Sequence, residues 1–338
     1  MDPLVSLKGK KIMQIGIVVK DAEKAAKRWG ELFGIGPWRL LDLPPTNVIL
    51  HDQPLRDYGG VIRIALANLG DLQFELLQPL HGPSTHMEFA KKHGQGIHHV
   101  SFGPVEDPDE MLAAMQKAGY GIEMQGTLGG ARTFIYMATQ NDLGTIFEFL
   151  KVAPGLQSTL KDYGSYTPQG PSVVNMKGKK IVQLGIIVKD TEKAAKRYWE
   201  VFGVGPWRLV DFPPTHATLH DKPLRDYDGV IRAAFANLGD LQLELLQPLH
   251  GPSTHMEFAK QHGQGIHHLS FHFLEDHDEM LAALRKAGYG IEMQGTLGGS
   301  RTFTYMSTQN DLGTIIEFVK AFPGAHNTIK DYGTYPPS

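Results

Sequence analysis

Polar side chains interrupt several apolar runs of this sequence, and their types fit a metal site. Glu75 lies in LQFELLQ and Glu148 in GTIFEFL, where the neighbours are apolar on both sides. Burying an unpaired carboxylate is costly, so each needs a partner. His98 and His99 lie in GIHHVSF, and because successive side chains of a strand face opposite sides, one imidazole points inward. Gln14 interrupts the run KIMQIGIVV in the same way.

Together, two carboxylates, an imidazole and an amide oxygen would suit a hard to borderline divalent cation such as Zn, Ni, Co, Mn or Fe(II). In octahedral geometry, two positions would stay open for water or substrate. The alternative is structural: the glutamates and the glutamine would lie at exposed sheet edges, and the histidine would be a hydrogen-bonded structural residue. The residue types alone leave both interpretations open.

The chain carries this set twice. Residues 9–166 reappear at 178–335 without a gap, and 38 of the 158 aligned positions differ. A repeat of this length indicates duplicated domains. We therefore expect a first domain at 9–166, a linker at 167–177 and a second domain at 178–335, with up to two metal ions per chain. The counterparts of the four candidate ligands in the second copy are Gln183, Glu244, His268 and Glu317.

Differences between the copies follow the alternation of the strands. Positions two residues from the candidate ligands are nearly all identical, whereas the intervening positions differ, as at Ile15/Leu184, Phe74/Leu243, Val100/Leu269 and Phe147/Ile316. We predict that the ligands share one face of a sheet and that the varying residues form the core behind it. We interpret the changes Ile64/Ala233 and Leu66/Phe235 as repacking against the helices.

The sequence of each copy predicts two successive modules with the element order β-α-β-β-β. A helix is expected to begin after Asp21 and end at Gly34, and a Thr85/Glu88 capping box is expected to open a short helix between the modules. The segment 44–60 is expected to be a loop. The remaining expected elements are strands at 11–19, 38–43, 61–67, 71–78, 97–102 and 145–151 and a helix at about 108–118.

The modules therefore span about 9–80 and 95–151 in the first copy and about 178–249 and 264–320 in the second. A KDYG motif ends each copy, at 161–166 and 330–335. Because no further domain follows the second motif, it indicates a docked tail, with a relic of the duplication as the alternative. The histidines between the modules (His81, His86, His93, His250, His255 and His262) are expected to face solvent.

Composition excludes several classes of partner. The 338 residues carry a net charge of −3 from interspersed charges, so neither nucleic acid nor an anionic membrane surface is an expected partner. The sequence contains no apolar run long enough for a membrane span, and its start lacks the apolar stretch of a secretory signal, so we expect a cytoplasmic protein. It contains no cysteine, which excludes thiolate ligands.

The runs QIGIVVKD, FGIGPW, LQFELLQPL, GIHHVSF and GTIFEF, with their repeats, resemble the vicinal oxygen chelate superfamily. This superfamily includes glyoxalase I, methylmalonyl-CoA epimerase, bleomycin and fosfomycin resistance proteins and extradiol dioxygenases. The resemblance covers nearly all of both copies. It implies an α+β fold in which two paired βαβββ modules form a cupped mixed sheet around one metal ion. By position, the implied ligands are Gln14, Glu75, His99 and Glu148, and Gln183, Glu244, His268 and Glu317.

The resemblance also implies a reaction class: a small carbonyl or carboxylate compound binds the metal, and a proton is removed from the adjacent carbon. Glu148 and Glu317 are the candidate bases. Arg63 and Arg232 stand where the epimerase carries its other base, and we expect their guanidinium groups to share the face of Glu75 and to bind a substrate carboxylate or support the enolate. The alternative is structural, with each arginine paired to a ligand carboxylate. This makes a metal-dependent isomerase, epimerase or lyase the first functional hypothesis.

Departures from the family patterns restrict the choice. The positions of the glutathione anchors of glyoxalase I hold Val18 and Pro79, or Ile187 and Pro248. An extradiol dioxygenase would need histidine in place of Gln14 or Glu75. The alternatives that remain are a resistance-type binding protein and an Fe(II)-dependent ring-cleaving dioxygenase.

Since single-copy relatives pair as dimers, we expect a dimer-like arrangement within one chain, which can associate further into a homo-oligomer. We also expect the second site to be the more polar, because Asn47 and Ile49 are replaced by His216 and Thr218.

Overall fold

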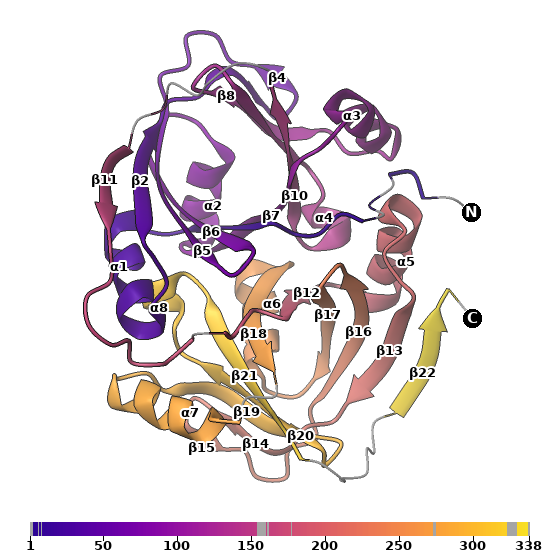
Figure 1. Cartoon of the computed structure of the whole chain (residues 1–338). Helices are drawn as coiled ribbons and strands as arrows, with labels where there is room; N and C mark the ends of the chain where they lie inside the picture. Colours follow the sequence, from indigo (N-terminus) through magenta and orange to yellow (C-terminus); the bar gives the residue numbers. More distant parts are fainter. Residues whose placement is uncertain are drawn as a thin grey trace.

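The computed structural model describes residues 3–5, 7, 9–153, 160, 162–176, 178–272, 275–322 and 330–336. The two copies form two halves that lie one above the other, each with a curved sheet (Figure 1). The elements of the first half are β1 (Gln14–Val18), α1 (Ala22–Phe33), β2 (Trp38–Leu43), β3 (Thr46–Leu50), β4 (Gln53–Pro54), β5 (Val61–Leu69), β6 (Leu72–His81), α2 (Thr85–His93), β7 (Gly96–Pro104), α3 (Pro108–Lys117), β8 (Ile122–Leu128), β9 (Arg132–Met137), α4 (Gln140–Leu143), β10 (Ile146–Val152) and β11 (Asp162–Tyr166).

The second half repeats this order. Its elements are β12 (Gln183–Ile187), α5 (Thr191–Phe202), β13 (Trp207–Phe212), β14 (Thr215–Leu219), β15 (Lys222–Pro223), β16 (Val230–Leu238), β17 (Leu241–His250), α6 (Thr254–His262), β18 (Gly265–His272), α7 (His277–Lys286), β19 (Ile291–Leu297), β20 (Arg301–Met306), α8 (Gln309–Leu312), β21 (Ile315–Ala321) and β22 (Lys330–Tyr335).

The sheet of the first half is built from two βαβββ modules. Its strand order is β11-β2-β5-β6-β1-β7-β10-β9-β8-β3-β4, with β6–β1 and β7–β10 parallel and the other neighbours antiparallel. The β1–β7 pair joins the modules at the centre. This confirms the predicted fold class, α+β with tandem domains that each pair two modules into a cupped mixed sheet.

Residue types explain the helix boundaries. The carboxylate of Asp21 accepts a hydrogen bond from the backbone N–H of Lys24, and Gly34 ends α1 with a φ of 68°. Both predictions are confirmed. The capping box at Thr85 is wrong by one residue, because Ser84 is the cap of α2 and accepts a hydrogen bond from Met87 N–H.

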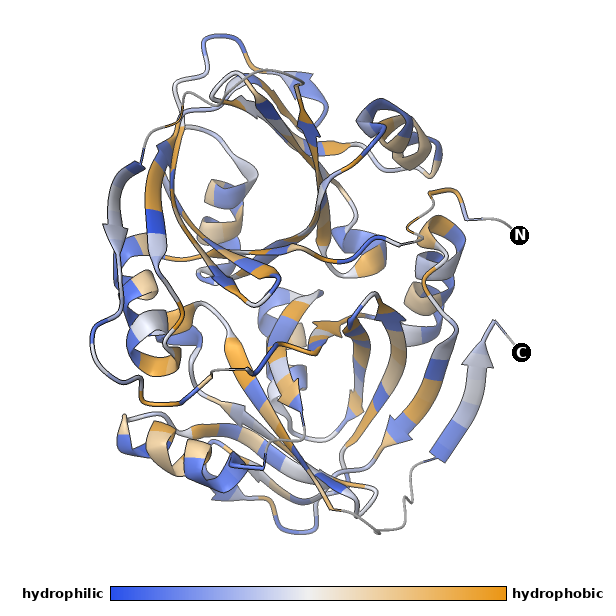
Figure 2. Cartoon of the chain, viewed as in Figure 1, coloured by the Kyte–Doolittle hydropathy of each residue, from blue (hydrophilic) through white to orange (hydrophobic). Residues whose placement is uncertain are grey.

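One face of each sheet packs against helices and the other lines the cup. The varying residues identified from the repeat lie on the helix side, where Ile15, Phe74, Val100 and Phe147 are buried with Trp29 of α1. Apolar and polar residues accordingly alternate along many strands (Figure 2). The predicted core behind the candidate ligands is confirmed.

Part of the expected loop at 44–60 is instead a short hairpin. β3 pairs with β8, so this segment of the first module extends the sheet of the second. Asn47, His51 and Asp52 adopt positive φ angles. Turns of this kind favour Asn and Asp, but the strands that flank them are too short to give a clear alternation pattern.

The KDYG tails are docked on the sheets. β11 pairs with β2 and β22 with β13, and Arg39 binds the carboxylate of Asp162 at 2.8 Å. The docked-tail prediction is confirmed for these strands, whereas Lys161 lies outside the described residues.

The halves meet in a contact that repeats about a pseudo-twofold axis. β7 meets β18 at Ile97 and Ile266. The side-chain amide of Gln95 donates to the carbonyl of Asn310 at 2.8 Å, and that of Gln264 donates to the carbonyl of Asn141 at 2.7 Å. The contacts between the tandem domains are thus consistent with the expected dimer-like arrangement within one chain.

Segments that precede each copy strengthen this contact. Val5 N–H bonds the Val201 carbonyl of α5 at 2.7 Å, and Val174 N–H bonds the Leu32 carbonyl of α1 at 2.8 Å. Each segment therefore docks on the half that it does not lead into.

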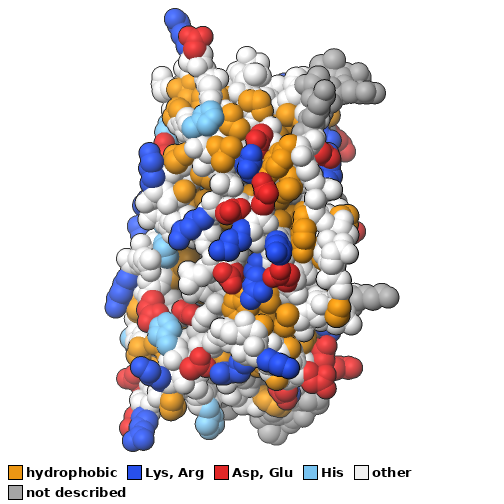
Figure 3. Space-filling view, turned by 90° about the vertical axis from the view of Figure 1, so that its left-hand side faces the viewer, with side chains coloured by type: hydrophobic (Ala, Val, Ile, Leu, Met, Phe, Trp, Pro, Cys, Tyr) orange, Lys and Arg blue, Asp and Glu red, His pale blue; other side chains and the backbone are white. Residues whose placement is uncertain are grey.

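No helix within the described residues is both long and apolar enough to cross a membrane. On the face shown in Figure 3, acidic and basic side chains are interspersed. This agrees with the charge pattern read from the sequence.

Candidate metal centre

Three of the four candidate ligands converge in each cup. In the first cup, His99 Nε2 lies 3.4 Å from Glu75 Oε2 and 3.8 Å from Glu148 Oε2. In the second cup, His268 Nε2 lies 3.4 Å from both Glu244 Oε2 and Glu317 Oε2.

These six residues are at most 8% exposed. Three strands thus bring one imidazole and two carboxylates together at the floor of each cup.

A glycine makes this convergence possible. Gly16 of β1 is the direct neighbour of both Glu75 and His99 across the sheet, and the imidazole of His99 lies over it. A methyl group at this position would overlap the ring. Gly185 has the same relation to His268, so both cups depend on a residue without a side chain.

The two candidate glutamine ligands lie on the same face but make different contacts. The amide N–H of Gln14 donates to Gln73 Oε1 at 2.8 Å. Gln183 donates to Gln242 at the same distance, and its own Oε1 lies 3.0 Å from His272 Nε2. Gln183 lines one cavity with Glu244 and Glu317.

Burial disfavours ionisation of these carboxylates unless positive charge lies beside them. Burial raises the pKa of Glu148 to about 7. In the second cup, burial acts to lower the pKa of His268, but the attraction of Glu317 and Glu244 raises it to about 9. Burial acts to raise the pKa of Glu317 as well. The attraction of the neighbouring His268 is stronger than this effect, so the pKa of Glu317 is lowered. A protonated imidazole or a metal ion can supply the positive charge.

Unpaired atoms indicate how a metal would fit. Within the described part of the chain, His99 Nε2 and Glu148 Oε2 are buried without a hydrogen-bond partner, as are His268 Nε2 and Glu317 Oε2. Buried polar atoms of this kind are rare in proteins and need an explanation. Since they face one another in a set of nitrogen and oxygen donors, the residues present fit a divalent cation.

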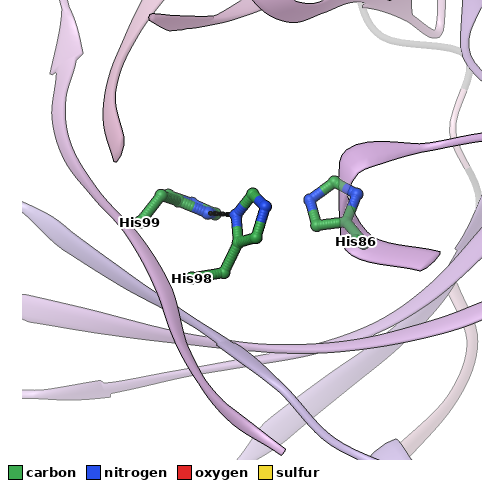
Figure 4. A group of neighbouring side chains, drawn as sticks. All are labelled: His86, His98 and His99. Carbon is green, nitrogen blue, oxygen red and sulfur yellow. Dashed lines mark hydrogen bonds between the residues drawn. The ribbon is translucent and has the colours of Figure 1, made fainter. Parts of the chain in front are cut away.

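His98 holds His99 in the orientation that such a site requires (Figure 4). The Nδ1 atoms of the two rings are 3.1 Å apart, and His98 Nε2 lies 3.2 Å from the hydroxyl of Thr85. Burial lowers the pKa of His98 well below its usual range, so the ring is neutral. If His99 Nδ1–H donates to His98, the lone pair of His99 Nε2 points at the carboxylates.

Replacing His98 by leucine is therefore expected to weaken metal binding at the first cup by about 10- to 100-fold, as the loss of an outer partner does at other metal sites. The measurement is a competition titration with a chromophoric chelator on the Glu244→Ala background, which leaves the first cup intact. His81→Leu, at an exposed position, is the control. An unchanged affinity in the His98 variant would show that His98 does not orient the ligand.

Two histidines that we expected in solvent are buried beside the site. His86 and His255 are each 1% exposed, and their Nε2 atoms lie 3.3 Å and 3.0 Å from the hydroxyls of Tyr136 and Tyr305. His86, His98 and His99 form a cluster of buried imidazoles whose ligand atoms lie within 4.8 Å of one another (Figure 4), and His255, His267 and His268 form the same cluster. The expectation was wrong because His86, Phe89 and His93 follow the helical spacing of an inward face.

The other histidines between the modules lie either at the contact between the halves or on the surface. His93 and His262 are only partly exposed and meet across the two halves, with ring centroids 5.5 Å apart. His81 and His250 are exposed, as expected.

Tyr136 is a site residue that the sequence did not reveal. It is the cross-strand neighbour of Glu148 on β9, and burial raises the pKa of its hydroxyl well above the usual range, with a further contribution from Glu148 and Glu75. The hydroxyl thus keeps its proton, and it lies within hydrogen-bond distance of His86 Nε2. The identical run RTF in both copies, followed two residues later by Tyr, was the available signal.

The buried histidines make stability depend on pH. Burial lowers the pKa of His86 and of His255 to about 3, against 6.5 in an unfolded chain. Between these values the unfolded state binds more protons, so stability is complete above pH 6.5 and is lost as the pH falls. We expect a loss of about 1.4 kcal/mol per pH unit for each of the two histidines below pH 6.

Urea unfolding between pH 7.5 and 5 tests this expectation, with the His86→Gln/His255→Gln variant as the control. The variant should take up about two protons fewer on unfolding, one for each histidine. The same pH slope in both proteins would contradict the expectation.

Arg63 and Arg232 do not reach the cups. In the register of β5 and β6, Arg63 pairs with Gln78 while Leu66 pairs with Glu75, which puts Arg63 on the opposite face. Its guanidinium binds Asp42 through two hydrogen bonds of 2.8 and 3.0 Å and lies over the ring of Tyr163. Arg232 does the same with Asp211 and Tyr332. The expectation that these arginines share the face of Glu75 is wrong, and the role assigned to them in the cup falls with it.

A cavity of about 500 Å³ opens above the carboxylates of the second cup. Its lining combines Glu244, Glu317 and Gln183 with apolar residues such as Phe212, Phe235 and Phe303. A volume of this size suits a small organic ligand. Neither His216 nor Thr218 is among the described residues that line it, so the two changes behind the expected polarity of the second site lie elsewhere.

Comparisons with known proteins find similar solved structures. A triple mutant of 4-hydroxymandelate synthase from Streptomyces coelicolor is similar in structure, with a TM-score of 0.56 and 13% identity over 93% of both chains. A Mn(II)-bound glyoxalase from Novosphingobium aromaticivorans gives a TM-score of 0.47 and 13% identity over 92% of this chain and 82% of its own. Methylmalonyl-CoA epimerase from Mycobacterium tuberculosis gives 0.32 and 24% identity over 42% of this chain and 88% of its own. No curated protein sequence matches.

A family model matches each half separately, at residues 13–136 and 182–305. These segments contain six of the eight candidate ligands and the strands that carry them, β1, β6 and β7 and their counterparts, while Glu148 follows the first segment and Glu317 the second. Members of this family include glyoxalases, epimerases and dioxygenases, and the superfamily binds divalent metals. Because the two matches cover most of the sequence, this chain belongs to the glyoxalase/bleomycin resistance protein/dioxygenase superfamily, the vicinal oxygen chelate proteins.

Proposed function

We propose that each cup is a divalent metal site and that the protein is an isomerase, epimerase or lyase that removes a proton beside a carbonyl or carboxylate group of a small molecule. The observation that carries the proposal is the buried set of one imidazole and two carboxylates, with unpaired atoms facing one another, repeated in both halves.

In the first cup, His99, Glu75 and Glu148 would hold the ion, with Gln14 as the fourth ligand. Their counterparts in the second cup are His268, Glu244, Glu317 and Gln183. A bound metal would supply positive charge that polarises the oxygens of the substrate and favours loss of the neighbouring proton. Zn, Ni, Co and Mn fit the nitrogen and oxygen donors.

Glu148 and Glu317 are the proposed bases. Each presents one carboxylate oxygen, Oε2, that no other group in the described residues satisfies. Glu317 also lines the cavity of the second cup, so a substrate can reach this base, and a proton held there can exchange with solvent. The base thus lies at the floor of the cup, next to the oxygens of a bound substrate.

Hydrogen exchange with solvent tests the proposal without a known substrate. Full-length protein loaded with Zn, Ni, Co or Mn is incubated in D₂O with a panel of 2-hydroxy and 2-oxo carbonyl compounds and thioesters. Deuterium incorporation beside the carbonyl, seen by NMR and absent after chelation, is the expected result. Metal-loaded protein that exchanges no member of the panel but binds some of them would instead support the binding-protein alternative, which the cavity also suits.

The dioxygenase alternative predicts a different dependence. It requires Fe(II) and consumes oxygen, while its usual ligand set has two histidines and one carboxylate. Each cup instead directs one imidazole and two carboxylates toward the centre. Oxygen uptake with Fe(II) and a catechol would favour this alternative over the isomerase or lyase.

A further inference from the structure

The inner faces of the two cups are not the same. Phe235 is the direct cross-strand neighbour of Glu244, whereas Leu66 takes this place beside Glu75. In the second copy, Phe212 also stands where the first copy has Leu43. Both phenylalanines line the cavity of the second cup. The change Leu66/Phe235, which the sequence had suggested was repacking against helices, therefore alters the binding surface.

The two phenylalanines form an aromatic wall. Their ring centroids are 5.7 Å apart and the ring planes are inclined by 69°, an edge-to-face arrangement. Ala233 replaces Ile64 two residues before Phe235 on the same face, which leaves more space beside the larger ring. The cavity keeps a volume of about 500 Å³ despite both rings.

A third change places a polar group in the second cup only. His272 lines the cavity with its Nε2 atom 3.0 Å from the Oε1 atom of Gln183. The corresponding residue of the first cup is Gly103, whose φ of 70° disfavours any side chain. The second cup thus combines aromatic carbon surface with an additional imidazole close to the candidate ligands.

We infer that the cups have diverged in substrate and that the second accepts compounds with an aromatic ring beside the chelating oxygens. The first cup, with Leu43, Leu66 and Gly103 at these positions, accepts aliphatic ones. Aromatic rings of a ligand gain edge-to-face contacts with Phe212 and Phe235 that a saturated ring of similar size does not. This inference rests on the proposed function, because the chelating oxygens need the metal.

Hydroxamates with one chelating head and different substituents separate the ring contact from metal binding. The probes are benzohydroxamate and cyclohexanecarbohydroxamate, titrated calorimetrically into full-length, Zn-loaded protein. Glu75→Ala leaves the second cup and Glu244→Ala leaves the first, and the metal content of each variant is measured beforehand. We expect the second cup to bind the phenyl compound about five- to tenfold more tightly than the cyclohexyl compound, and the first cup to show no such preference.

Returning the wall to leucine supplies the decisive variant. Phe212→Leu/Phe235→Leu on the Glu75→Ala background should abolish the preference and retain the metal, whereas Phe322→Leu, at an exposed position, should change neither. The same preference in both cups, or a preference that survives loss of the two rings, would overturn the inference and leave the proposed function intact. Failure of both hydroxamates to bind either metal-loaded cup would overturn the proposed function and this inference together.

Discussion

Replacing Glu148 and Glu317 together by glutamine is expected to slow metal-dependent hydrogen exchange by at least about 100-fold. The amide keeps the shape of the side chain and one oxygen able to contact a metal, but it cannot accept a proton from carbon. The metal should therefore remain bound while the exchange rate falls. The measurement is the rate of deuterium incorporation for the best compound of the panel, together with metal content.

The two single variants, Glu148→Gln and Glu317→Gln, report each cup separately. Glu110→Gln/Glu279→Gln, at exposed positions on α3 and α7, provides the matched control. If Glu148→Gln/Glu317→Gln exchanges hydrogen as fast as this control, neither glutamate is the base, even if the metal site itself proves correct.

Adding one methyl group beneath each histidine is expected to empty both sites. In Gly16→Ala/Gly185→Ala, the new carbon overlaps the imidazoles of His99 and His268, which must rotate or shift. Since the rings are fully buried between two carboxylates, we expect metal content to fall to near zero and stability to fall by about 1–3 kcal/mol. Metal analysis and urea unfolding check the two effects.

Gly59→Ala is the control, because an added methyl group there meets no atom within 4 Å. The single variants should each lose about half the metal, which also tests whether the two cups are independent. Full metal content in the double variant would mean that His99 and His268 are not ligands.

The burial of the candidate ligands could be predicted because their neighbours in the sequence are apolar. Glu75 and Glu148 lie in runs too apolar for an exposed strand, and the structure brings both within 4 Å of His99. The repeat then located the ligand face, since Ile15 and Phe74 vary where they pack against the helix.

Register limited the prediction for the residues that failed. Arg63 and Leu66 lie on one strand, and their assignment to a face depends on the register that the β5–β6 turn sets, in which Leu69 pairs with Leu72 and Leu66 with Glu75. A one-residue error exchanges the two faces of a strand. The expected places of Arg63 and of the Leu66/Phe235 change were therefore both reversed.

His86 was missed for a different reason. It belongs to a short helix whose polar composition suggests solvent, and only the packing of α2 against the sheet buries it. The spacing of His86, Phe89 and His93 indicates an inward face, but the helix alone does not show which part of the sheet that face packs against.

The most direct test of the proposed metal centres is the number of metal ions per chain. Full-length protein is purified without chelators or a His tag and analysed by plasma mass spectrometry, beside the Glu75→Ala/Glu244→Ala variant. Two cups predict a content approaching two divalent ions per chain, lost in the variant, with Zn, Ni, Co or Mn favouring the isomerase or lyase and Fe the dioxygenase. Folded protein that carries no metal and cannot be reloaded would contradict the metal centres and the proposed chemistry.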